Sequence, residues 1–205
     1  MDTEHLLSPP QSLAVAYAPP GQRRELALLL AFDNRLKGIA ANGRELLLQQ
    51  LRLAWWREQL DKPIEARPRG EPLLAQLAEC ERADMLVQSM QRLIDAWELL
   101  VASGEAGKPQ DLTEANRMRA DMVFAGYARR ASSSEAIIAQ AQQAGLQWAQ
   151  ASLGLASLND LPPPPLPGLK PLNLLLMAAV IDAGQGGRSR FWKFVRLYWH
   201  ALTGR

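Results

Sequence analysis

The segment Glu45–Asp61, ELLLQQLRLAWWREQLD, constrains the fold more than any other part of the chain. At a helical period, its apolar side chains fall on two roughly opposite sides. The first side carries Leu47, Leu48, Leu51, Ala54 and Trp55, and the second carries Leu46, Leu53, Trp56 and Leu60. A helix that is apolar on two sides is expected to lie between two layers of other helices.

One acid, Glu58, falls within the first apolar side of this helix, beside Leu51 and Trp55. Burying a carboxylate among apolar side chains costs free energy unless the carboxylate is paired. We therefore expect Glu58 either to be paired on burial or to face a cavity. Trp55 and Arg52, which share this helix, are further candidates for lining such a cavity.

Length and composition predict one globular domain over residues 1–205. Hydrophobic residues make up 48% and charged residues 21%, which is ordinary for a chain with one core. Because Cys80 is the single cysteine, an internal disulfide is excluded and a reducing compartment fits. No signal-peptide pattern precedes the domain, and the longest apolar run, Leu172–Ile181, is about half of the ~20 residues that a spanning helix needs. We therefore expect a cytoplasmic protein.

Apolar periodicity predicts an all-α fold of about six or seven helices, since no stretch shows strand alternation. The expected helices cover residues 22–40, 45–61, a long stretch ending near 101, and then 112–131, 133–156, 172–183 and 189–203. Asp111 with Glu114 and Ser132 with Glu135 are expected to cap two of them. Residues 1–21 are expected to be an irregular lead-in, and the proline-rich residues 161–168 a connector.

Two of these helices have a distinctive composition. The long helix carries a core-facing stripe, which we assign to packing: Leu86, Met90, Leu93, Ile94, Trp97, Leu100 and Val101. Residues 136–159 hold no charged side chain, which predicts a central helix whose glutamines are satisfied internally or line a polar space.

Asp33 and Lys37 lie inside the apolar face of the helix over residues 22–40. They are four residues apart with the acid first, which favours an ion pair at the edge of that face. The alternative is a polar spot inside the bundle, formed by Asp33, Lys37 and Glu58, with Arg35, Arg52 or Arg119 nearby. Both interpretations remain open at this point.

The C-terminal residues 189–205 predict an amphipathic helix with a basic side. Its candidates for contact with an anionic membrane surface are Trp192, Lys193, Arg196 and Trp199. Indole rings at the border of an apolar face and cations beside them suit a lipid surface. A terminal helix docked on the bundle explains the same pattern, so peripheral membrane association is one of two alternatives.

Several kinds of chemistry find little support in the sequence. The two histidines, His5 and His200, lie near the chain ends, which disfavours Ser–His or Cys–His catalysis and a zinc site. The GQGG segment at 184–187 lacks the lysine and the preceding strand of a phosphate-binding loop. With a net charge of +2, we expect no nucleic-acid partner.

The segment PPGQRRELALLLAFDNRLKGIAANGRELLLQQLRLAWWREQLD resembles the squalene/phytoene synthase family, in particular a subgroup in which an AFD helix precedes an RLxWWRxxL helix. LIDAWELL, AGLQWA and RLYWHALTGR are further similarities. The resemblance implies an all-α isoprenoid-synthase fold. Active members join two prenyl diphosphates, using two aspartate-rich motifs that hold Mg²⁺ against the departing diphosphate.

The chain departs from those motifs at both places. Lys37 stands in DNRLK where the family's Asp-x-x-x-Asp has its second acid, and residues 136–159 offer no acid for the second motif. We therefore expect a shortened, degenerate and non-catalytic member without a metal cofactor, which binds a prenyl or other lipid ligand or a protein partner. The alternative is an active prenyltransferase of isoprenoid biosynthesis that uses Mg²⁺.

Overall fold

The computed structural model describes residues 6–42, 45–103, 109–131, 133–155 and 165–183. These residues are helices, turns and loops, and no strand occurs among them, which confirms the predicted all-α class. The helices are α1 (Pro9–Ala16), α2 (Pro20–Asn42), α3 (Leu46–Asp61), α4 (Pro72–Ala78), α5 (Ala83–Ser103), α6 (Pro109–Ala120), a π-helical segment (Asp121–Ala125), α7 (Gly126–Arg130), α8 (Glu135–Ser152) and α9 (Lys170–Ala183).

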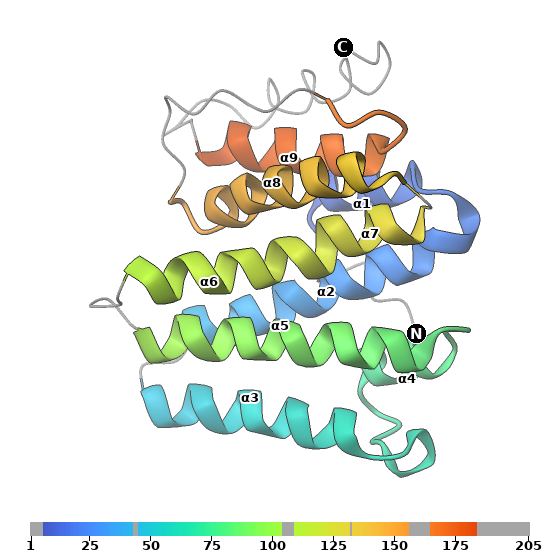
Figure 1. Ribbon diagram of the computed structural model, residues 1–205. Helices are drawn as coiled ribbons and strands as arrows, with labels where there is room; N and C mark the ends of the chain where they lie inside the picture. The colour runs from blue at the N-terminus through green and yellow to red at the C-terminus, as the bar shows by residue number, and fades with distance from the viewer. Residues whose placement is uncertain (1–5, 43–44, 104–108, 132, 156–164, 184–205) are drawn as a thin grey trace.

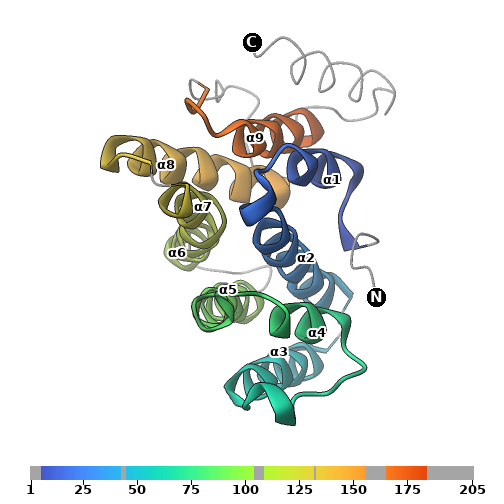
Figure 2. The ribbon, with the colours of Figure 1, turned by 90° about the vertical axis from the view of Figure 1, so that its right-hand side faces the viewer.

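The helices stack in layers with α3 at one edge of the bundle and α9 near the other (Figure 1). α3 packs on α5, which also contacts α2 and α6, and α8 packs between α6 and α9 (Figure 2). The core is built around α2, whose fully buried side chains include Leu26, Leu29, Phe32 and Leu36. This arrangement is the helical bundle expected of an isoprenoid-synthase-like fold.

The stripe assigned to packing on α5 is confirmed. All its members are buried except Leu100, which is half-buried. The predicted long helix is divided, however, because the chain turns at residues 79–82 between α4 and α5. The turn residues Glu79 and Cys80 donate backbone hydrogen bonds to Gln76 and Leu77, which end α4.

The irregular lead-in predicted for residues 1–21 is wrong for α1. Pro9 and Pro10 stand in the first turn of that helix, where a missing N–H leaves no intrahelical bond unmade. The Ser8 N–H is satisfied by Gln11 Oε1 at 2.8 Å, so the helix begins in spite of its prolines. Two predicted caps also shift: α6 begins at Pro109, before Asp111, and Ser134 rather than Ser132 caps α8.

α8 packs closely against the π-helical segment through Gly145. A Cβ atom added there would lie 2.7 Å from the Cβ of Phe124, so this approach requires glycine. Two of the five glutamines of α8 depart from the expectation that they are satisfied internally or line a polar space. Gln140 and Gln143 are exposed, because the helix buries only its alanine, glycine and tryptophan side.

The prediction that α3 lies between two layers is wrong within the described part of the chain. Its second apolar side is buried against the bundle through Leu53, Trp56 and Leu60. Its first side is exposed: Leu47 is 64% and Leu51 56% accessible. α3 is an edge helix (Figure 1), so it has a packing partner on one side.

The predicted C-terminal helix and part of the predicted connector lie outside the described residues. The predicted helix over residues 189–205, with Trp192, Lys193, Arg196 and Trp199, is not part of the described structure, nor are residues 161–164 of the connector. Among the helices that are described, none combines the length and apolarity that crossing a membrane requires.

Candidate functional site

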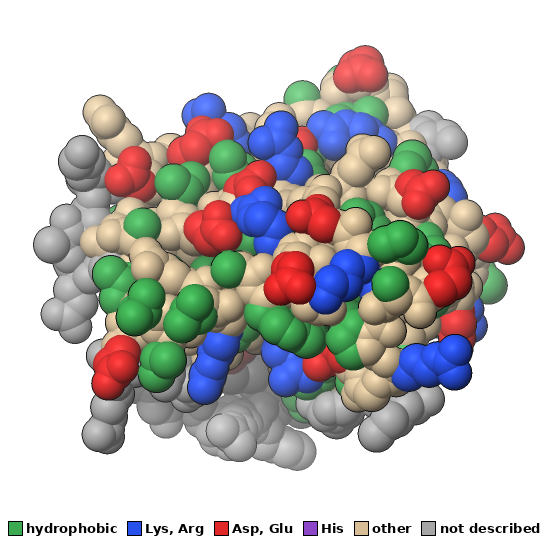
Figure 3. All heavy atoms as spheres, turned by 90° about the horizontal axis from the view of Figure 1, so that it is seen from below, with side chains coloured by type: hydrophobic (Ala, Val, Ile, Leu, Met, Phe, Trp, Pro, Cys, Tyr) green, Lys and Arg blue, Asp and Glu red, His purple; other side chains and the backbone are tan. Residues whose placement is uncertain are grey.

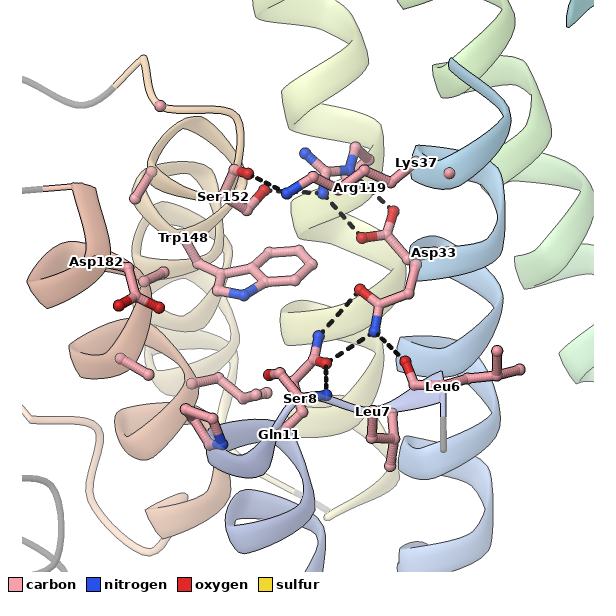
Figure 4. Close-up of a pocket in the computed structure, with 18 of the residues that line it drawn as sticks. Leu6, Leu7, Ser8, Gln11, Asp33, Lys37, Arg119, Trp148, Ser152 and Asp182 are labelled. Atoms are coloured by element: carbon pink, nitrogen blue, oxygen red, sulfur yellow. Dashed lines mark hydrogen bonds and ion pairs between the residues drawn. The ribbon is translucent and has the colours of Figure 1, made fainter. Parts of the chain in front are cut away.

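A pocket of about 800 Å³ lies between the N-terminal residues and helices α1, α2, α6, α8 and α9 (Figure 4). Its polar lining comes mainly from α2, α6 and α8, and its apolar lining from the N-terminal segment, α8 and α9. The lining residues are Leu6, Leu7, Ser8, Pro10, Gln11, Asp33, Asn34, Lys37, Gly38, Ala41, Arg119, Trp148, Ala151, Ser152, Gly154, Leu175, Ala178, Ala179 and Asp182.

Asp33 lies at the inner wall of this pocket and is 2% exposed. Its Oδ2 accepts a hydrogen bond from Arg119 NH2 at 2.8 Å, and its Oδ1 accepts one from Arg119 Nε at 3.0 Å. The indole Nε1 of Trp97 donates a third bond to Oδ1 at 2.8 Å. Both carboxylate oxygens are therefore engaged by donors of the protein itself.

Arg119 is completely buried, and each of its five N–H groups has an acceptor. Besides Asp33, the acceptors are Asn116 Oδ1, the Ala149 carbonyl oxygen and Ser152 Oγ. Its guanidinium also lies 4.8 and 5.1 Å from the ring centroids of Trp97 and Trp148. Such a saturated cation–carboxylate pair is a fixed structural element of the wall.

Lys37 lies one turn along α2 from Asp33 and also lines the pocket. Its Nζ donates a hydrogen bond to the backbone oxygen of Ser152. The predicted ion pair between Asp33 and Lys37 is wrong, because Arg119 occupies the carboxylate and Lys37 turns toward α8. The pocket lining thus carries the Lys37 ammonium group and the Asp182 carboxylate in addition to the Asp33–Arg119 pair.

Asn34, on the same helix as Asp33 and Lys37, holds the N-terminal segment against α2. Its Nδ2 donates to the Leu6 carbonyl oxygen at 2.8 Å and to Gln11 Oε1 at 2.7 Å, and Gln11 Nε2 donates back to Asn34 Oδ1 at 3.2 Å. These bonds fix Leu6 and Leu7 against α2, where they supply apolar lining.

The structure separates the cavity candidates that the sequence named. Asp33 and Lys37 line the pocket, whereas Arg52, Trp55 and Glu58 lie on the exposed side of α3 and are not among its lining residues. The expectation that Glu58 is buried or faces a cavity is corrected. Its side chain is 64% exposed and pairs with Lys62 at 2.8 Å, because α3 has no layer on that side among the described helices.

Trp97, Trp148 and Ser152 were missed as functional candidates. Trp97 was assigned to packing alone, although a buried indole N–H needs an acceptor. Asp33, the acid in the apolar face of α2, was the sequence signal that could have identified this acceptor. Of the three arginines named as possible neighbours of Asp33, Arg119 is the one that binds it.

A second hollow of about 660 Å³ lies between α5 and the π-helical segment. Its arginines are paired with acids: Arg57 bonds Asp95 at 2.7 Å and Glu98 at 2.8 Å, and Arg129 bonds Asp121 at 2.6 Å. Since these pairs neutralise most of its charge, the pocket beside Asp33 is the stronger candidate site.

Magnesium does not fit the donors of the described pocket. Mg²⁺ prefers an octahedron of oxygens that includes one or two free carboxylates. Asp33 already accepts three N–H donors, and the next position of the motif is the cation Lys37. Nowhere in the described ranges do three or more Asp, Glu, His or Cys side chains converge as a possible metal site.

The fold and the pocket define an all-α protein with an open pocket between packed helices. The family model of squalene/phytoene synthase matches residues 8–103, which span α1 to α5. The match covers slightly less than half of the chain, and over these residues the chain is similar to the squalene/phytoene synthase family, as its sequence predicted. No curated protein and no solved structure gives a significant match.

Proposed function

We propose that this chain is a non-catalytic member of the squalene/phytoene synthase family that holds a prenyl or other lipid ligand in the pocket beside Asp33. The observation that carries the proposal is that both carboxylate oxygens of Asp33 are engaged by donors of the protein itself. The two oxygens accept three hydrogen bonds, from Arg119 and Trp97, in a site that is almost fully buried.

Condensation of prenyl diphosphates needs carboxylates that are free to hold Mg²⁺ against the leaving group. Freeing Asp33 for a metal would leave Arg119 buried without its counter-charge, which costs about 3–5 kcal/mol in comparable buried pairs. Lys37 would then place a cation one turn away from the metal. The local electrostatics therefore favour a binding site over metal-dependent ionisation.

The pocket has the size and composition of a lipid site. Its volume of about 800 Å³ falls within the usual range of small-molecule pockets. Leu6, Leu7 and Leu175 supply apolar surface for a hydrocarbon chain, and the Trp148 ring forms one wall. Lys37 supplies a cationic group for a polar or anionic head, so we expect an amphiphile with a prenyl-like chain.

A substitution that fills the pocket tests this proposal. Gly38 lines the pocket, and an added Cβ there meets nothing within 4 Å, so Gly38→Leu should occupy ligand space without disturbing α2. Gly21, on the same helix, is equally open but does not line the pocket. Binding of farnesol and farnesyl diphosphate, measured by tryptophan fluorescence without Mg²⁺, should weaken about tenfold in Gly38→Leu and stay unchanged in Gly21→Leu.

The same measurement has contradicting outcomes. Equal affinity in both variants, or no binding of either prenyl compound by the unmodified protein, would refute a lipid site at this pocket. Mass spectrometry of lipid extracted from the purified protein identifies the ligand class independently.

An active prenyltransferase is the second candidate, favoured by the family match over residues 8–103. It requires diphosphate to be released from farnesyl or geranylgeranyl diphosphate in the presence of Mg²⁺. The non-catalytic proposal would be replaced if diphosphate release were proportional to the amount of protein, lost in Gly38→Leu and kept in Gly21→Leu.

A further inference from the structure

The exposed side of α3 is a continuous apolar surface formed by Leu47, Leu48, Leu51, Ala54 and Trp55, here called the α3 face. The four large side chains of this face are between 39% and 64% accessible. Hydrophobic side chains gather over the N-terminal half of α3 when the molecule is seen from that side (Figure 3). Exposed apolar side chains in such a group usually mark an interaction surface.

The pattern of this face is self-complementary under a two-fold axis through Leu51. When two copies of α3 run antiparallel about that axis, residue i of one copy lies level with residue 102 − i of the other. Leu47 then faces Trp55 of the second copy, Leu48 faces Ala54, and Leu51 faces Leu51. Every large apolar residue of the face gains an apolar partner, and the small Ala54 leaves room for a leucine.

The same register gives Glu58, which pairs with Lys62 within its own helix, a further contact in the second copy. Seven residues beyond Leu51, it lies level with the start of α3 in the second copy. The N-cap residue Glu45 makes no side-chain hydrogen bond to the first turn, so the N–H groups of that turn have no side-chain cap. A helix N-terminus carries partial positive charge and favours a carboxylate beside it.

We infer that two copies of this chain associate through the α3 face, antiparallel and with Leu51 on the two-fold axis. The mixed charge around the face fits a second copy better than a lipid surface. Arg52 and Lys62 are balanced by Glu58 and Asp61, whereas a membrane-binding face should carry an excess of cations. One helix face offers less than the ~800 Å² per partner of a standard interface, so the dimer should dissociate on dilution.

Leu51→Glu tests the interface, with Leu46→Glu as its matched control. Both leucines are on α3 and are about half exposed, at 56% and 50%, but Leu46 lies outside the α3 face. Sedimentation velocity over a wide concentration range should show dimers of the unmodified protein and of Leu46→Glu. Leu51→Glu should raise the dissociation constant about 100-fold or more, because it places two like charges face to face.

The register is tested by cross-linking. Leu51→Cys should form a disulfide-linked dimer on mild oxidation, whereas Leu46→Cys should not, since only residue 51 meets its own copy. The native Cys80 is buried and should remain reduced in both variants.

Three results would overturn the inference: a monomer at every concentration, a dimer that survives Leu51→Glu, or equal loss of the dimer in both glutamate variants with unchanged thermal unfolding. Binding of the monomer to phosphatidylcholine vesicles, lost in Leu51→Glu, would assign the face to a membrane instead.

Discussion

At Asp33 the carboxylate offers about four acceptor sites, and three N–H donors occupy three of them. Two of these donors belong to Arg119, which is 86 residues away in the sequence. Arg119 therefore determines the role of Asp33. An aspartate that a family motif would assign to a metal is here the counter-ion of a buried guanidinium.

Replacing one member of this pair should destabilise the fold strongly. Asp33→Ala leaves Arg119 buried without its counter-charge, and we expect the free energy of unfolding to fall by about 3–5 kcal/mol. The double variant Asp33→Leu/Arg119→Met removes both charges and should lose much less than the sum of the single changes. Urea denaturation followed by circular dichroism measures all three values.

The exposed Gln140→Ala, in the middle of α8, provides the control for this series, since a surface change away from other features should stay within about 0.5 kcal/mol. If Asp33→Ala proved as mild as Gln140→Ala, the ion pair would not hold the pocket wall together.

Burial raises the pKa of the Tyr127 hydroxyl above its ordinary value, and Arg130 offsets part of that effect. The unfolded chain therefore releases this proton at a lower pH than the folded chain does. The corresponding stability is complete below the ordinary pKa of about 10 and is lost as the pH rises through the higher folded pKa. Urea midpoints should consequently fall above about pH 10.

Tyr127→Phe isolates this effect, because it keeps the ring and removes the titrating group. Above about pH 10, the urea midpoint of Tyr127→Phe should increasingly exceed that of the unmodified protein. A constant difference from pH 8 to pH 11 would show that Tyr127 titrates alike in the folded and unfolded chains.

Residue types predicted some of these contacts and not others. Asp33 and Lys37 could be named from the sequence because polar groups in an apolar helical face need an explanation. Arg119 was one of three arginines named as possible neighbours of Asp33. Neither the choice among them nor the Ser152 partner of Lys37 could be predicted, since these residues become neighbours only when α6 and α8 pack beside α2. Glu58 was misjudged for the same reason: the sequence shows a second apolar side of α3 but not whether anything covers it.

Among the elements, the long helices were predictable and the short ones were not. α2, α3 and α5 carry clear apolar periods. The structure has α2 and α3 near their predicted bounds, and α5 ends near its predicted end but begins at Ala83, after the turn that divides the predicted helix. α1 was missed because prolines suggested a loop. The turn between α4 and α5 was missed because the apolar residues of both helices join into one apparent stripe.

The contact of α8 with the π-helical segment can be tested through its glycine. Gly145→Ala should cost about 1–3 kcal/mol of unfolding free energy, because the new methyl group overlaps Phe124, whose Cβ lies 2.7 Å from its position. The result is measured by thermal and urea unfolding.

Gly38→Ala is the control for that change. It is also within a helix, but its Cβ meets nothing within 4 Å, so it should stabilise the protein by about 0.5–1 kcal/mol. Equal changes in the free energy of unfolding for Gly145→Ala and Gly38→Ala would mean that α8 does not approach Phe124 this closely.

On the scale of the whole molecule, the match over residues 8–103 covers α2 and its Asp33 but ends before α6 and α8. The pocket needs both parts, since α2 supplies Asp33 and Lys37 while α6 and α8 supply Arg119, Trp148 and Ser152. The family resemblance could therefore predict the all-α class and the first motif. It could not predict the pocket, whose wall joins residues far apart in the sequence.

The central claim is that the pocket binds a prenyl chain without using Asp33 as a metal ligand. Isothermal titration calorimetry with farnesyl diphosphate, with and without Mg²⁺, tests it most directly when released diphosphate is assayed in the same samples. We predict equal affinity under both conditions and no diphosphate release. Binding that appears only with Mg²⁺, accompanied by diphosphate release, would contradict the account.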